Sequence, residues 1–150
     1  MALDAALAYL HFFCVLSLTA VLTAEAVLLR PALIAQSGRW LARIDLAYLG
    51  VAAAALASGL SRAVWGAKGW SYYAHNPVFH AKIGLFVLIG LISVAPTLAF
   101  LRWARNFRRD PAYTVPLAEL KKARRYVMIE IHLLMLLPLF GVMMARGLRF

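Results

Sequence analysis

The chain has 150 residues, of which 64% are hydrophobic, and it carries a formal net charge of +10 at pH 7. Soluble domains are about 45–50% apolar, so this composition indicates an integral membrane protein. Membrane proteins collect Lys and Arg in their cytoplasmic loops, which explains the positive charge without nucleic acid as a partner. The single cysteine, Cys14, excludes a disulfide framework and a cysteine-based zinc site.

Four apolar segments are each long enough to cross a bilayer, which takes roughly 20 residues. In chain order, the predicted spans are residues 4–29, 44–64, 78–103 and 126–145. The stretch VAAAALASGLS in the second span is rich in small residues, which predicts close packing against other helices. We expect kinks at Pro96 and Pro138. The predicted fold class is all-α, a four-helix transmembrane bundle that forms one domain over the whole chain.

Basic residues are unevenly distributed between the two sides of this bundle. Eleven of them fall in or beside the first and third connections: Arg30, Arg39, Arg43, Arg102, Arg105, Arg108, Arg109, Lys121, Lys122, Arg124 and Arg125. Four fall on the other side: Arg62, Lys68, Arg146 and Arg149. The positive-inside rule therefore predicts an N-out, C-out orientation.

Ionisable residues within the spans are the candidates for function, because they cost free energy in lipid and usually face the bundle interior. On the outer side, His11 lies in the first span and Arg62 ends the second. His80 and Lys82 begin the third. At about 1.5 Å of rise per residue, the three helices bring these groups to a shared depth.

His80 and Lys82 are two residues apart, and residues so spaced do not share a helix face. Only one of them can therefore point directly at a small ligand. The more common roles are structural: His80 suits a wet aromatic belt, and Lys82 and Arg62 suit anchors that reach the interface. The spacing alone leaves open which of the two faces the bundle interior.

The inner side carries a second group of ionisable residues, which is mainly acidic. Glu25 ends the first span and Asp45 begins the second. Glu130 and His132 lie in the fourth. We expect polar supports or proton-handling groups here. The alternative is a set of interhelical ion pairs, for which the available cations are Arg43, Arg124 and Arg125.

The sequence contains no GxSxG, HExxH or phosphate-binding loop, so we expect no nucleotide or zinc site. An intramembrane His with nearby cations suits haem b or a porphyrin, because imidazole ligates iron and Arg or Lys pair with propionates. His11 is then the iron ligand, His11 and Lys82 the catalytic groups, and Arg62 and His80 further cofactor-binding residues. Two alternatives stay open: a non-catalytic accessory or structural subunit with buried ion pairs, and a transporter or channel formed by an oligomer.

The whole chain resembles the small four-helix bacterial membrane proteins grouped as domain of unknown function 2214. The matching segments are LHFF around His11, AEAVLLRP from Ala24 to Pro31, RIDLAYLG from Arg43 to Gly50, SGLSR ending at Arg62, NPVFHAK ending at Lys82, APTLAFLRW ending at Trp103 and PLFGVMMARG ending at Gly147. The resemblance implies a multi-pass protein of the bacterial inner membrane. Its partners would be the lipid bilayer and, in a homo-oligomer or larger complex, other membrane proteins.

A more distant resemblance is to the HemJ-type protoporphyrinogen oxidases. Their early His in the first helix matches His11, and an aromatic–small–Lys segment that opens a later helix matches Phe79 to Lys82. This resemblance implies haem or porphyrin binding by His11, with Lys82 close to the porphyrin, and an oxidoreductase activity. The last helix differs, because an Asn-Glu-x-Pro element stands in that family where this chain has Ile129, Glu130, Ile131 and His132.

Overall fold

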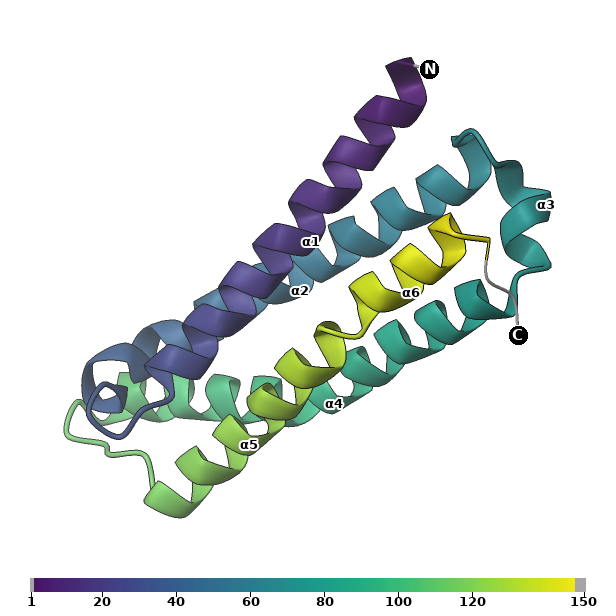
Figure 1. Ribbon diagram of the computed structural model, residues 1–150. Helices are drawn as coiled ribbons and strands as arrows, with labels where there is room; N and C mark the ends of the chain where they lie inside the picture. The colour runs from purple at the N-terminus through teal and green to yellow at the C-terminus, as the bar shows by residue number, and fades with distance from the viewer. Residues whose placement is uncertain (1, 148–150) are drawn as a thin grey trace.

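The computed structural model describes residues 2–147, and this part of the chain is helical throughout apart from short turns, with no strand (Figure 1). In chain order the helices are α1 (Ala2–Leu28), α2 (Ile34–Trp65), α3 (Gly69–Ala74), α4 (Pro77–Arg109), α5 (Leu117–Leu134) and α6 (Leu137–Ala145). The predicted all-α fold class is therefore confirmed.

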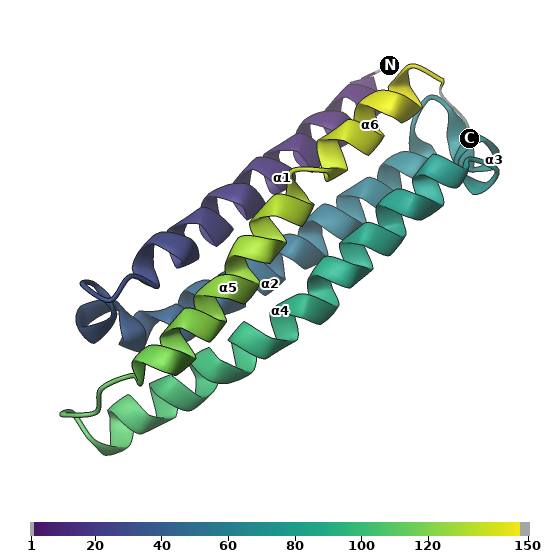
Figure 2. The same ribbon diagram turned by 60° about the horizontal axis from the view of Figure 1, so that its bottom comes forward.

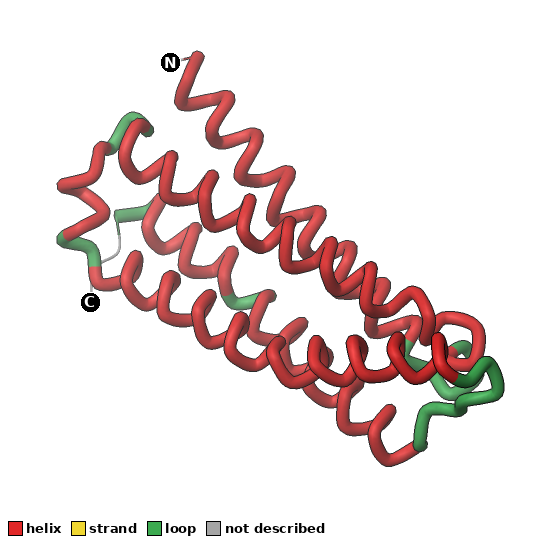
Figure 3. The backbone as a smooth tube through the Cα atoms, turned by 180° about the vertical axis from the view of Figure 1, so that it is seen from behind, coloured by secondary structure: helices red, strands yellow, loops and turns green. Residues whose placement is uncertain are grey.

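The long helices form a bundle in which α1 packs against α2 and α5, α2 packs against α4, and α4 packs against α5 and α6 (Figure 2). α5 and α6 follow one another along a single path and together make the fourth member of the bundle. The short α3 links α2 to α4 at the end where α1 begins and α6 ends (Figure 3). We call this the α3 end, and the opposite one, with the turns at residues 29–33 and 110–116, the basic end.

Four helical stretches are long and apolar enough to cross a membrane: Ala2–Leu28, Ile34–Trp65, Pro77–Arg109 and Leu117–Ala145. Their outward faces carry large apolar side chains. Among them are Leu16, Leu91 and Leu98, whose exposed fractions in the isolated chain are 70%, 67% and 61%. Such a continuous apolar exterior is the surface that a bilayer covers, so these faces contact lipid.

The helices continue beyond the predicted spans at the basic end. α2 begins at Ile34 rather than near residue 44, and α4 continues to Arg109 rather than ending near residue 103. Arg-rich segments are good helix formers, so helical structure does not stop where apolar composition stops. Gly38 lets the extended part of α2 approach α4 closely, because a Cβ there would lie 2.6 Å from Cε2 of Phe107.

The two internal prolines behave differently. α4 continues through Pro96 without interruption. The fourth member breaks between Leu134 and Leu137, and Pro138 lies in the first turn of the helix that restarts. Proline has no N–H to donate, and its ring clashes with the carbonyl four residues earlier, so it favours the first turn of a helix over an interior position.

The core is built from one buried stripe on each helix. On α1, Cys14, Leu18, Leu22 and Glu25 recur at intervals of three and four residues, which places them on one face. Trp103 on α4 fills the space between α4 and α5 and is fully buried. The stripe on α1 therefore carries a carboxyl group at a position where the helix periodicity calls for a core residue.

Candidate functional site

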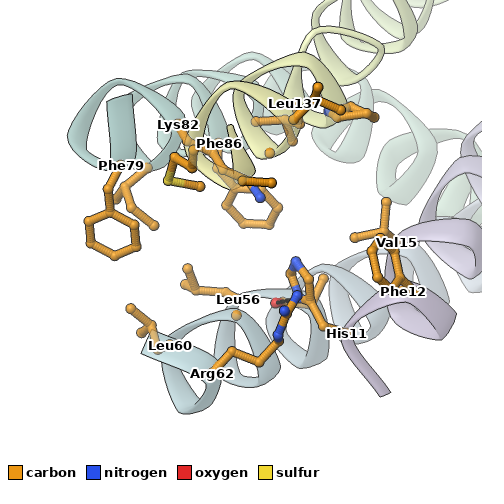
Figure 4. Close-up of a pocket in the computed structure, with 18 of the residues that line it drawn as sticks. His11, Phe12, Val15, Leu56, Leu60, Arg62, Phe79, Lys82, Phe86 and Leu137 are labelled. Atoms are coloured by element: carbon orange, nitrogen blue, oxygen red, sulfur yellow. Dashed lines mark hydrogen bonds between the residues drawn. The ribbon is translucent and has the colours of Figure 1, made fainter. Parts of the chain in front are cut away.

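A cavity of about 530 Å³ lies in the half of the bundle nearest the α3 end. Its walls come from α1 and α2 on one side and from α4 and α6 on the other, as Figure 4 shows. Most of the lining is aliphatic or aromatic, including Phe12, Phe79 and Phe86. One imidazole and three cationic side chains also line it: His11, Arg62, Lys68 and Lys82.

The His11 ring is held by α2. Its Nδ1 lies 3.2 Å from the carbonyl oxygen of Ala55 and 3.1 Å from Oγ of Ser58. A carbonyl oxygen can only accept, so a hydrogen bond to Ala55 requires the proton on Nδ1 and leaves the lone pair of a neutral ring on Nε2. Gly59 gives the ring its room, because a Cβ at that position would lie 3.0 Å from Cε1 of His11.

Arg62 and Lys82 bring positive charge to the cavity without a carboxylate beside it. The Nε atom of Arg62 is buried and has no hydrogen-bond partner, and its guanidinium carbon lies 5.9 Å from the ring centroid of Phe12. Lys82 projects toward α6, where a Cβ on Gly141 would lie 3.9 Å from Nζ. Among residues 2–147 the ion pair that forms joins Arg102 to Glu119, at the opposite end of the bundle. Two half-buried cations that face open space favour the binding of an anionic group.

His80 lies outside the cavity lining. Its ring is exposed, and Nε2 lies 2.9 Å from the carbonyl oxygen of Ala74, at the C-terminal end of α3. The two residues of the pair thus point in different directions, as their spacing requires: Lys82 lines the cavity, and His80 contacts the α3 segment.

A second polar site, the carboxylate cluster, is formed by Glu25 on α1, Asp45 on α2 and Glu130 on α5. All three are buried, with 1%, 3% and 1% of their surface exposed. Tyr48 donates to Oε2 of Glu130 at 3.1 Å, and Thr97 on α4 donates to Oδ1 of Asp45 at 3.1 Å. One oxygen of Glu25 and one of Glu130 have no partner in the described structure. All four members of the bundle therefore contribute to this site.

The remaining residues expected near the carboxylates do not join them. His132 is exposed, and its Nδ1 lies 2.6 Å from the carbonyl oxygen of Met128, one turn earlier on the same helix. The three arginines considered as partners are exposed: Arg43, Arg124 and Arg125. None of the interhelical ion pairs expected for a purely structural subunit is present among residues 2–147.

Several residues of both sites did not stand out in the sequence. Ser58 and Gly59 lie within the small-residue stretch that predicted close packing, but nothing in the pattern connected them with His11. Tyr48 follows Asp45 by three residues and so shares its helix face, a signal that was available. Thr97 gives no comparable signal, because its role depends on how α4 is rotated against α2.

Chemically, the cavity offers one imidazole and three cationic side chains within an otherwise apolar enclosure. Within the described residues, no group of three or more His, Cys, Asp or Glu is arranged to hold a metal ion. A largely apolar molecule that carries acidic groups matches this lining. Its apolar part would contact the aliphatic and aromatic walls, and its acidic groups would pair with Arg62 and Lys82.

The fold and the site together define a four-helix membrane protein with a cation-lined cavity at one end. More specifically, the chain belongs to the family described as Predicted membrane protein (DUF2214), whose sequence model matches residues 3–149. Comparisons with curated proteins and with solved structures found no match.

Proposed function

We propose that the cavity binds a tetrapyrrole, either haem b or a porphyrin. The observation that supports this is the convergence of His11, Arg62 and Lys82, from three different helices, on one apolar cavity. The cavity volume of about 530 Å³ also falls in the range of roughly 300–1,000 Å³ common for small-molecule and cofactor sites.

The donor set fits such a group. The hydrogen bond from Nδ1 of His11 to Ala55 orients the ring and leaves Nε2 as the nitrogen that would ligate iron. A backbone carbonyl is a common partner of metal-ligating histidines. Arg62 and Lys82 would hold the acidic side chains of the macrocycle, and they have no competing carboxylate in the described structure. A bound haem would add redox chemistry to this site.

The resemblance to HemJ-type proteins extends the proposal to an oxidoreductase that acts on a porphyrin. In that case His11 and Lys82, which both line the cavity, are the groups able to hold or move a proton beside the bound ring. Conversion of protoporphyrinogen to protoporphyrin by membranes that contain the protein, lost in Lys82→Ala, tests this extension separately from binding.

The location that fits this function is the bacterial inner membrane, with both termini outside, so that the cavity lies in the outer half of the bilayer. The unequal charge of the two ends supports this orientation, because eleven of the Lys and Arg residues lie at or near the basic end. A homo-oligomer or a larger membrane complex stays open, and crosslinking in native membranes would detect either one.

The direct test of binding is an absorption spectrum. The protein is purified in nanodiscs after expression with ample haem, beside His11→Ala and the matched control His80→Ala. We expect a Soret band in the wild type and in His80→Ala, and its loss or a marked shift in His11→Ala. No Soret band in the wild type, together with no binding of iron-free protoporphyrin, would rule out the proposal.

A further inference from the structure

The cavity is closed on one side and open on another, and the two sides face different surroundings. We propose that its ligand enters sideways from the outer half of the bilayer, through a portal between α1 and α6. The identity of the ligand rests on the function proposed above, whereas the portal rests on the arrangement of the cavity rim.

Near α3, the cavity is closed by hydrogen bonds between parts of the chain that are distant in sequence. Tyr72 on α3 donates to the carbonyl oxygen of Met144 at 2.8 Å, and Lys68 donates to the same oxygen at 3.3 Å. The backbone N–H of Ala67 donates to Oδ1 of Asp4 at 3.0 Å. The segment that connects α2 to α4 is therefore tied both to the end of α6 and to the start of α1.

In the part of the chain that the structure describes, α1 and α6 do not pack closely against each other. Three apolar residues of α1 and α6 line the cavity and are also exposed on the outer surface of the bundle: Phe12 (61%), Leu16 (70%) and Val142 (56%). α6 packs on α4, whereas α1 packs on α2 and α5 (Figure 2). The cavity wall therefore changes from one helix pair to the other between α1 and α6. A rim of this composition opens into hydrocarbon rather than into water.

The depth of the cations fits entry along the plane of the membrane. Arg62 lies three residues before the end of α2, and Lys82 lies five residues after the start of α4. At about 1.5 Å per residue, both side chains start within roughly 8 Å of a helix end, near the polar boundary of the bilayer. An acidic amphiphile keeps its carboxylates at that same boundary. It can therefore move sideways into the cavity without carrying charge across hydrocarbon.

The first test asks what the rim contacts. In a Cys14→Ala background, which removes the only cysteine, Leu16→Cys and Val142→Cys carry a fluorophore in nanodiscs. Leu98→Cys on the exposed face of α4 serves as the lipid control, and Thr114→Cys in the turn after α4 serves as the water control. Portal labels quenched by lipid-attached nitroxide, as at position 98, support the proposal. Portal labels quenched by aqueous iodide, as at position 114, overturn it.

The second test follows entry itself with iron-free protoporphyrin, by stopped-flow fluorescence. Val142→Trp narrows the portal, and we expect association about tenfold slower. Tyr72→Phe removes the hydrogen bond to Met144 at the closed end, and we expect an unchanged rate. Faster association in Tyr72→Phe with no effect of Val142→Trp would show entry from the α3 end and contradict the portal. If wild type binds no porphyrin, the proposed function fails, while the quenching result still decides whether the cavity opens to lipid.

Discussion

Near the α3 end, His11, Arg62 and Lys82 surround an open cavity. Toward the basic end, Glu25, Asp45 and Glu130 lie in a packed core, where neighbouring helices supply hydroxyl groups as partners. Both groups of residues are costly within a membrane, but only the first leaves room beside its charges. The comparison separates two uses of polar residues in one bundle, a site that can accept a ligand and a site that joins four helices.

This difference decides what substitutions should do. Changes in the packed half should lower stability, because they leave cavities or unpartnered polar atoms behind. Changes around the cavity should leave stability nearly intact and alter binding instead, because these side chains face open space or lipid. The predictions below compare matched substitutions in the two halves.

The largest effect is expected for Trp103→Ala. Trp103 is fully buried, and its Nε1 donates to Oε2 of Glu119 at 2.9 Å. Loss of a buried aromatic side chain costs about 3–5 kcal/mol, so the free energy of unfolding in mixed micelles should fall by that amount. Phe12→Ala at the cavity rim is the control, and its 61% exposure predicts a change below about 1 kcal/mol. Equal losses in both variants would contradict the distinction between a packed and an open half.

A smaller effect is expected for Tyr48→Phe. The substitution removes the donor to Oε2 of Glu130, whose other oxygen already has no partner in the described structure. A buried polar atom left without a partner costs about 1–3 kcal/mol, which the same unfolding assay resolves. Tyr9→Phe is the matched control, because Tyr9 is 73% exposed on the outer face of α1. A Tyr48→Phe variant as stable as the control would show that the carboxylate cluster does not hold the helices together.

The smallest change concerns Gly59→Ala, which adds one methyl group against the His11 ring, 3.0 Å from Cε1. The ring must move, so its hydrogen bond to Ala55 and the direction of Nε2 should change. We expect haem or porphyrin affinity to fall by about tenfold, or 1.4 kcal/mol, in a titration followed by absorbance. Gly90→Ala is the control, since a Cβ there meets nothing within 4 Å. Unaltered affinity in Gly59→Ala would show that the orientation of the His11 ring does not determine binding.

Two rules of helix geometry made much of this predictable. Position along each helix brought His11, Arg62 and Lys82 to one depth, and the spacing of two residues separated His80 from Lys82. The same spacing separates Arg43 from Asp45, which is one reason that this arginine, expected as a partner of the carboxylates, instead lies 4.8 Å from the ring centroid of Trp40.

Other features depend on how the helices are rotated against each other, which a sequence pattern does not specify. The contact of His11 with Ala55 is a bond to a backbone carbonyl, for which no side-chain signal exists. The bond from Thr97 to Asp45 needs a particular rotation of α4 against α2. The cavity itself depends on the break between α5 and α6, which Pro138 indicated as a kink, and on the position of α3, which periodicity does not predict.

The central claim is that Arg62 and Lys82 hold the acidic groups of a tetrapyrrole in the cavity. The most direct measurement compares protoporphyrin with its dimethyl ester, which has the same ring but no carboxylates, by fluorescence titration in nanodiscs. Because charge-assisted hydrogen bonds are roughly twice as strong as neutral ones, wild type should bind the acid at least about tenfold more tightly than the ester. This preference should disappear in the Arg62→Gln/Lys82→Gln double variant. Equal affinity of the wild type for the acid and the ester would contradict the account.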